Sequence, residues 1–164
     1  MSTQPPRPYD LVMFDWNGTL SSGLVAQEER SVGQITALFP GVKEVLKTLK
    51  SRGIKIGIAT AASRFEMSYE ISSHELEGLF DCVYTLTEGP AKPDPYALIE
   101  AMTLLEISPQ RTLMVADTRR DMQMARNARV TGIGVSYGLH HADELREAGA
   151  LHVISEIQEL LDLS

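Results

Sequence analysis

Short apolar runs alternate with longer stretches of helical spacing along most of this chain. The runs are residues 11–14, 54–59, 82–85, 112–116, 133–136 and 152–154. The stretches between them carry apolar residues three or four positions apart, as in a helix that buries one face. Strands that alternate with helices pair in parallel, and the helices cover both faces of the sheet. The pattern therefore predicts an α/β fold, a three-layer Rossmann-like parallel sheet.

Glycine and proline mark where the helices should begin and end. Pro40-Gly41 precedes a helix that Gly53 closes, and Pro93-Asp94-Pro95 begins another with a capping Asp. Further helices are expected over about 63–76, 120–129 and 142–148, and a last one carries Ile157, Leu160 and Leu161. The signal from 21 to 39 is mixed and predicts no element.

The length and composition indicate one globular domain. The chain has 164 residues, 43% of them hydrophobic and 23% charged. We expect a proline-rich, disordered tail over 1–8 and a single core domain over 9–164. No apolar run is long enough to span a membrane. Cys82 is the single cysteine, so no intramolecular disulfide can form and a cytoplasmic location is expected.

The formal net charge of −7 bears on partners. Binding to a nucleic-acid backbone requires clustered Lys and Arg, so nucleic acid is not expected as a partner. A small anionic substrate is compatible with this charge, because it responds to the local field of a cleft.

Polar residues stand at the predicted carboxyl ends of three strands: Asp15, Thr60 and Asp117. In open α/β sheets, ligands bind outside those strand ends where the strand order reverses. If the order is 3-2-1-4-5, with a sixth strand at the edge, then Asp15 and Asp117 face each other. Two carboxylates that close repel unless a cation or proton lies between them, and oxygen ligands favour Mg²⁺.

Four segments resemble, in order, the motifs of the haloacid dehalogenase superfamily of aspartate-nucleophile hydrolases. They are Asp15-Trp16-Asn17-Gly18-Thr19-Leu20, Thr60 after Ile58-Ala59, Lys92 before Pro93, and Asp117-Thr118-Arg119-Arg120-Asp121. Ala116 stands where the fourth motif usually has Gly. Val135-Ser136-Tyr137-Gly138 is similar to the phosphoglycolate-phosphatase-like branch, and the resemblance runs from about Leu11 to Leu161.

The resemblance implies roles for single residues in a Mg²⁺-dependent phosphatase. Asp15 would be the nucleophile and a metal ligand, with the Asn17 backbone oxygen, Asp117 and Asp121 completing the metal site. Thr60 would bind the phosphoryl oxygens, and Lys92 would neutralise charge between nucleophile and phosphate. Gly18, Thr19 and Ala61, with Lys92, are the residues expected to contact substrate.

Asn17 departs from the family pattern, which has a second Asp there as general acid and base. An amide donates a hydrogen bond but exchanges no proton at neutral pH. The resemblance therefore implies slow turnover that favours leaving groups needing no proton. The alternative is a catalytically impaired module that binds Mg²⁺ and phosphate as a scaffold or regulator.

The branch also inserts a helical cap after its first motif, and the interval 21–39 is too short for one. The resemblance thus implies a capless enzyme whose open site admits a small phosphorylated metabolite or a phosphoprotein. Relatives without a cap also shield the site with a neighbouring subunit, so a homo-oligomer is a further expectation. A receiver domain, the other class with Asp, Thr and Lys, requires an acidic pair after strand one, which is absent.

Overall fold

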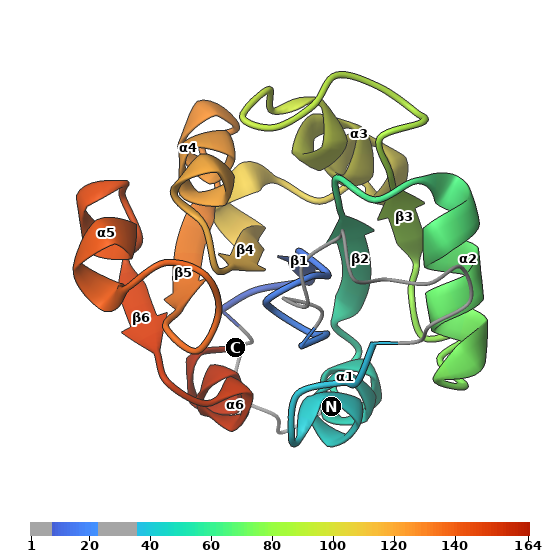
Figure 1. Ribbon diagram of the computed structural model, residues 1–164. Helices are drawn as coiled ribbons and strands as arrows, with labels where there is room; N and C mark the ends of the chain where they lie inside the picture. Colours follow the sequence, from blue (N-terminus) through green and yellow to red (C-terminus); the bar gives the residue numbers. More distant parts are fainter. Residues whose placement is uncertain (1–7, 23–35) are drawn as a thin grey trace, which may run out of the picture.

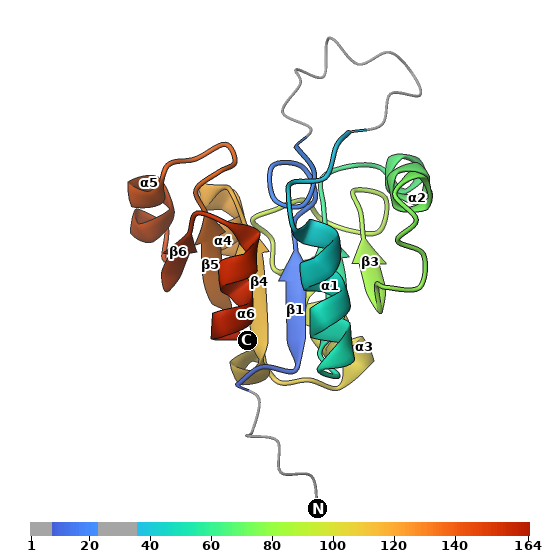
Figure 2. The same ribbon diagram turned by 90° about the horizontal axis from the view of Figure 1, so that it is seen from below.

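The computed structural model describes residues 8–22 and 36–164 as a parallel sheet between two layers of helices (Figures 1 and 2). Its strands are β1 (Leu11–Phe14), β2 (Lys55–Ala59), β3 (Cys82–Tyr84), β4 (Thr112–Ala116), β5 (Thr131–Val135) and β6 (His152–Ile154). Its α-helices are α1 (Val42–Ser51), α2 (Arg64–Ser73), α3 (Tyr96–Leu105), α4 (Arg119–Asn127), α5 (Ala142–Glu147) and α6 (Leu160–Leu163). Short 3₁₀ turns lie at Pro109–Arg111 and Ile157–Glu159.

The strand order is β3-β2-β1-β4-β5-β6, and every pair is parallel. This order confirms the predicted arrangement, with the sixth strand at the edge beside β5. The first crossovers build the sheet outward from β1 through β2 to β3, and the chain then returns to pair β4 with β1. Strand order therefore reverses between β1 and β4, at the centre of the sheet (Figure 1).

Side chains of the central strands alternate between two cores. Val12 and Phe14 of β1 pack in a core with α1, α2 and α6, and Leu11 and Met13 pack with α3, α4 and α5. All four β1 side chains are fully buried, which explains why the strand reads as a continuous apolar run. The two helical layers hold β1 in place, and its carboxyl end is where the chain turns polar.

The expected elements are present, with boundaries that differ by a few residues. β5 begins two positions before the expected Ile133, because Thr131 and Gly132 already pair with β4. Asp94 lies one residue before Pro95, the N-cap residue of α3, and its Oδ1 accepts a 2.9 Å bond from the Tyr96 N–H at the helix start. The last helix begins as a 3₁₀ turn before α6.

Two expectations fall largely outside the described residues. The first is the disordered tail expected over 1–8, and the second is the absence of a cap from the interval 21–39. Most of both ranges lies outside the described residues, so the two expectations stay predictions. The flanks of that interval are described, and Ser21 forms an antiparallel bridge with Leu38. Within 8–22 and 36–164, no helix has the length and apolar character that crossing a membrane requires.

Candidate active site

Asp15 and Asp117 meet at the point where strand order reverses. β1 and β4 pair in register with Phe14 opposite Val115, and the Asp15 N–H donates to the Val115 carbonyl at 3.1 Å. The chain leaves both strands just beyond this pair. Since the carboxyl ends of parallel neighbours lie at the same edge, the two carboxylates are brought together by the sheet itself.

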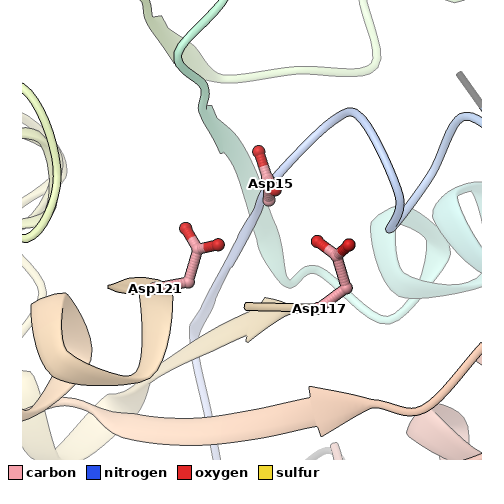
Figure 3. Close-up of side chains that lie close together, drawn as sticks. All are labelled: Asp15, Asp117 and Asp121. Atoms are coloured by element: carbon pink, nitrogen blue, oxygen red, sulfur yellow. The ribbon is translucent and has the colours of Figure 1, made fainter. Parts of the chain in front are cut away.

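Asp121 joins them from the first turn of α4. One carboxylate oxygen from each of Asp15, Asp117 and Asp121 lies within 4.8 Å of the other two. Figure 3 shows the three side chains around one space between the ends of β1 and β4 and the start of α4. Their exposed fractions are only 7%, 1% and 1%. Such a buried acidic group requires a compensating positive charge or protons.

Lys92 supplies one positive charge to the cluster. Its Nζ lies 2.9 Å from Asp15 Oδ1 and 2.6 Å from Asp121 Oδ1. Burial lowers the pKa of Lys92, but the charges of Asp121 and Asp15 outweigh it, so the pKa is raised and the ammonium stays charged. Three carboxylates and one ammonium leave two negative charges when all are ionised, and a divalent cation would balance them.

Burial has the opposite consequence for the carboxylates. It raises the pKa of Asp15 to about 8; Lys92 opposes the shift, and Asp121 and Asp117 add to it. Burial and the charge of Asp121 also raise the pKa of Asp117, against a hydrogen bond from the Leu139 N–H. Without a cation, the cluster therefore holds a proton at neutral pH, as close carboxylates do.

Hydrogen bonds from two segments fix the Asp117 carboxylate. Oδ1 accepts from the Thr19 hydroxyl at 3.1 Å, and Oδ2 accepts from the Leu139 N–H at 2.9 Å. Two glycines permit this close packing. A Cβ at Gly18 would lie 2.1 Å from Asp117 Oδ2, and one at Gly138 would lie 2.4 Å from both Asp117 Cβ and the Gly18 oxygen. Thr19 thus holds Asp117 and Gly18 leaves room for it, while their expected contact with substrate stays a prediction.

Thr118 orients Asp121 and starts α4. As the N-cap residue, its hydroxyl accepts from the Asp121 N–H at 3.2 Å, and it lies 2.5 Å from Asp121 Oδ2. Thr and Asp are good cap and first-turn residues, because they satisfy free N–H groups at the helix start. The same local geometry that begins the helix aims Asp121 at Lys92.

Thr60, Ala61 and Lys92 line one small cavity of about 30 Å³ beside the cluster. Thr60 ends β2 and is buried, and its hydroxyl accepts a 3.1 Å bond from the Ala62 N–H. The end of β2 thus brings Thr60 and Ala61 to one cavity with Lys92. Asn17 lies in the turn after β1, where its buried side-chain Oδ1 accepts no hydrogen bond from the residues that the structure describes.

The model of one protein family, described as haloacid dehalogenase-like hydrolase, matches residues 14–135 of this chain. This range includes Asp15, Thr60, Lys92, Asp117 and Asp121. The chain belongs to this family. Among curated relatives, it is 28% identical over 129 residues to a phosphoglycolate phosphatase of Pseudomonas putida, covering 78% of this chain and 47% of that protein. It is 32% identical over 126 residues to pyrophosphatase PpaX of Bacillus mycoides, covering 76% and 59%.

The haloacid dehalogenase-like fold is equally clear in three dimensions. A crystal structure of a predicted phosphoglycolate phosphatase from Haemophilus somnus superposes with a TM-score of 0.84 at 17% identity, over 95% of this chain and 98% of that one. At this identity the likeness establishes the fold. By contrast, this chain spans about half the length of the phosphoglycolate phosphatases that it matches in sequence.

The structure adds residues that sequence reasoning did not assign to this haloacid dehalogenase-like site. Leu139 contributes a backbone N–H to Asp117, and the Tyr137 hydroxyl donates to the Thr19 carbonyl at 2.7 Å. Thr118 orients Asp121. The sequence pointed to Tyr137 and Leu139 only through Gly138 between them. This glycine belonged to the segment that resembles the phosphoglycolate-phosphatase-like branch, but it had been given no role. A backbone donor leaves no mark on residue type, so Leu139 could not be recognised.

Proposed function

We propose that this chain is a Mg²⁺-dependent phosphatase that acts through an aspartyl-phosphate on Asp15. The observation that carries the proposal is the buried group of three carboxylates with Lys92 at the strand ends. Membership of a hydrolase family whose relatives include phosphatases supports it. We propose a small phosphorylated metabolite or a phosphoprotein as the substrate class.

The donor set suits Mg²⁺, a hard cation that prefers carboxylate and carbonyl oxygens. Asp15, Asp117 and Asp121 would hold it, together with the backbone oxygen of Asn17. When bound, the cation would neutralise charge on the phosphoryl oxygens and on the carboxylates. It would also displace the proton that burial retains on Asp15, leaving this carboxylate ionised for attack.

In the proposed reaction, Asp15, Lys92 and Thr60 have different roles. An Asp15 oxygen forms a bond to phosphorus while the bond from phosphorus to the leaving oxygen breaks, and water later hydrolyses the aspartyl-phosphate. Lys92, already 2.9 Å from Asp15 Oδ1, balances negative charge between nucleophile and phosphoryl group. Thr60 would donate its hydroxyl to a phosphoryl oxygen. The backbone N–H of Trp16 donates to Asp15 Oδ1 at 2.8 Å and orients the carboxylate.

Asn17 limits the reaction. Its amide cannot protonate a leaving alkoxide or deprotonate the hydrolytic water. We therefore propose slow turnover with alkyl phosphates and faster turnover with acyl or aryl phosphates, whose leaving groups need no proton. The same residue favours a second candidate, a module that binds Mg²⁺ and phosphate without turning substrate over.

Exchange of Asn17 for Asp tests both ideas. We expect Asn17→Asp to raise the rate on an alkyl phosphate by about 10² to 10⁴, the range for general acid–base catalysis, and to change the rate on nitrophenyl phosphate much less. Steady-state assays of wild type and variant on both substrates measure this, with Asp15→Asn as the inactive control. Equal rates for the two proteins on both substrates would contradict the role of Asn17. No turnover of acetyl phosphate by wild type would favour the non-catalytic module.

A further inference from the structure

Glu70 is a buried carboxylate outside the group described above. It lies in α2 with an exposed fraction of 5%, although Glu66, one turn earlier on the same helix, is exposed. Among the residues that the structure describes, the only basic side chain within ion-pair distance is His74, whose Nε2 is 3.4 Å from Glu70 Oε2. Burial of an acid is costly, so stability alone gives no reason for Glu at this position.

A chain of hydroxyl groups connects Glu70 to the turn after β1. The Thr36 hydroxyl lies 3.0 and 2.9 Å from the two Glu70 oxygens, and the Thr36 N–H donates to Oε1 at 3.4 Å. The Thr36 hydroxyl donates to the Glu70 carboxylate, and a hydroxyl has only one proton to donate. Thr36 Oγ1 therefore accepts from the Ser21 hydroxyl, with which it is in contact.

Ser21 closes the turn that carries Asn17. Its carbonyl accepts from the Gly18 N–H at 2.7 Å, and its N–H donates to the Trp16 carbonyl at 3.0 Å. The other end of the turn also lies against this part of α2, since the Trp16 and His74 rings are 6.2 Å apart between centroids. Glu70 and its partner His74 thus reach both ends of residues 16–21.

We propose that Glu70 is a positioning residue that holds the turn 16–21, and through it the Asn17 backbone oxygen, in the geometry the active site requires. The proposal rests on the proposed function for its catalytic consequence. Glu70 acts through Thr36 and Ser21 and touches no reacting atom. It also joins two parts of the site, because α2 begins at Arg64, four residues after Thr60, so that the turn and the loop after Thr60 share one support.

Glu70→Gln tests the proposal, because it keeps the shape of the side chain and removes its charge. Glu66→Gln is the matched control on the exposed face of α2. Thr36→Val, which removes only the middle hydroxyl, is a second variant should Glu70→Gln fold poorly. We expect both test variants to weaken Mg²⁺ binding measured by calorimetry, and kcat/KM for acetyl phosphate, by about tenfold. The control should match wild type.

Two readouts on the metal-free protein make the result independent of activity. Hydrogen exchange at the amides of Gly18, Thr19 and Ser21 should be about tenfold faster in both test variants, while β4 amides exchange as in wild type. The emission of Trp16, the single tryptophan, should change in Glu70→Gln and not in Glu66→Gln. The double variant that combines Glu70→Gln with Thr36→Val should show no larger effect than either single variant, because both residues act through one chain of hydrogen bonds.

Wild-type exchange and Mg²⁺ affinity in both test variants would overturn the proposal. A fall in thermal stability with wild-type exchange at the turn would also overturn it, because that result describes a merely structural residue. Failure of the proposed function gives a different pattern. In that case wild type would bind no Mg²⁺ and hydrolyse nothing, while exchange and Trp16 emission would still decide whether Glu70 holds the turn.

Discussion

At the scale of single residues, the site is a group of three buried carboxylates that the sheet and α4 bring together, with Lys92 in contact with two of them. Asp15 and Lys92 could be assigned from the sequence because their residue types and order match motifs. The raised pKa of Asp15 could not be predicted in this way, because it depends on burial and on the distances to Asp117 and Asp121, which no sequence pattern gives. Asn17 was also recognised from its motif, but only the structure shows that its Oδ1 is buried without a hydrogen-bond donor among residues 8–22 and 36–164.

The raised pKa of Asp15 predicts an unusual pH dependence for the metal-free protein. Folded Asp15 keeps its proton up to about pH 8, whereas the unfolded carboxyl has the ordinary pKa of 3.8. The folded state therefore binds more protons between these values, and its stability falls as pH rises from about 4 to about 8. The midpoint of thermal unfolding in EDTA, measured from pH 5 to 9, should decline across this window.

Asp15→Asn should flatten much of that decline, and the raised pKa of Asp117 should leave a remainder. Asp143→Asn is the control, because the Asp143 side chain is 92% exposed. Saturating Mg²⁺ should flatten the curve of wild type, because the cation replaces the proton. The same slope in wild type and Asp15→Asn would show that Asp15 is ionised in the metal-free fold.

At the scale of secondary structure, the start of α4 serves the helix and the site together. The Thr118 cap and the direction of Asp121 are one piece of geometry. The sequence predicted the start of this helix within one residue, at about 120 against the observed Arg119, but placed its end two residues beyond Asn127. It did not reveal that the loop after β5 folds back onto Asp117, since that contact joins residues 22 positions apart through a backbone N–H.

We predict that Thr118→Ala lowers stability by about 1 kcal/mol, the usual cost of a lost cap, and weakens Mg²⁺ binding by about tenfold, because Asp121 loses its orienting partner. Ser63→Ala is the matched control: Ser63 caps α2 by the same bond, to the Glu66 N–H. It should lose similar stability and keep wild-type Mg²⁺ affinity. Thermal unfolding and calorimetry measure the two effects. Equal loss of Mg²⁺ affinity in both variants would contradict the role of Thr118.

At the scale of the whole molecule, the alternation of apolar runs and amphipathic helices predicted the parallel sheet, but not by itself the order of its strands. Parallel strands joined by helices admit few topologies, and Asp15 and Asp117 at strand ends favoured the order that makes β1 and β4 neighbours. The position of Glu70 could not be predicted in the same way. Its burial depends on Thr36 and Ser21, which lie far from it in sequence, and a Glu in a helix normally faces solvent.

The central claim is that Asp15 takes up the phosphoryl group in a reaction that requires Mg²⁺. Incubation with acetyl phosphate and Mg²⁺, followed by an acid quench and peptide mass spectrometry, tests it most directly. We predict one phosphorylated peptide, modified at Asp15 in wild type with Mg²⁺ and absent both in EDTA and in Asp15→Asn. Phosphate on another residue, or undiminished hydrolysis by Asp15→Asn, would contradict the claim.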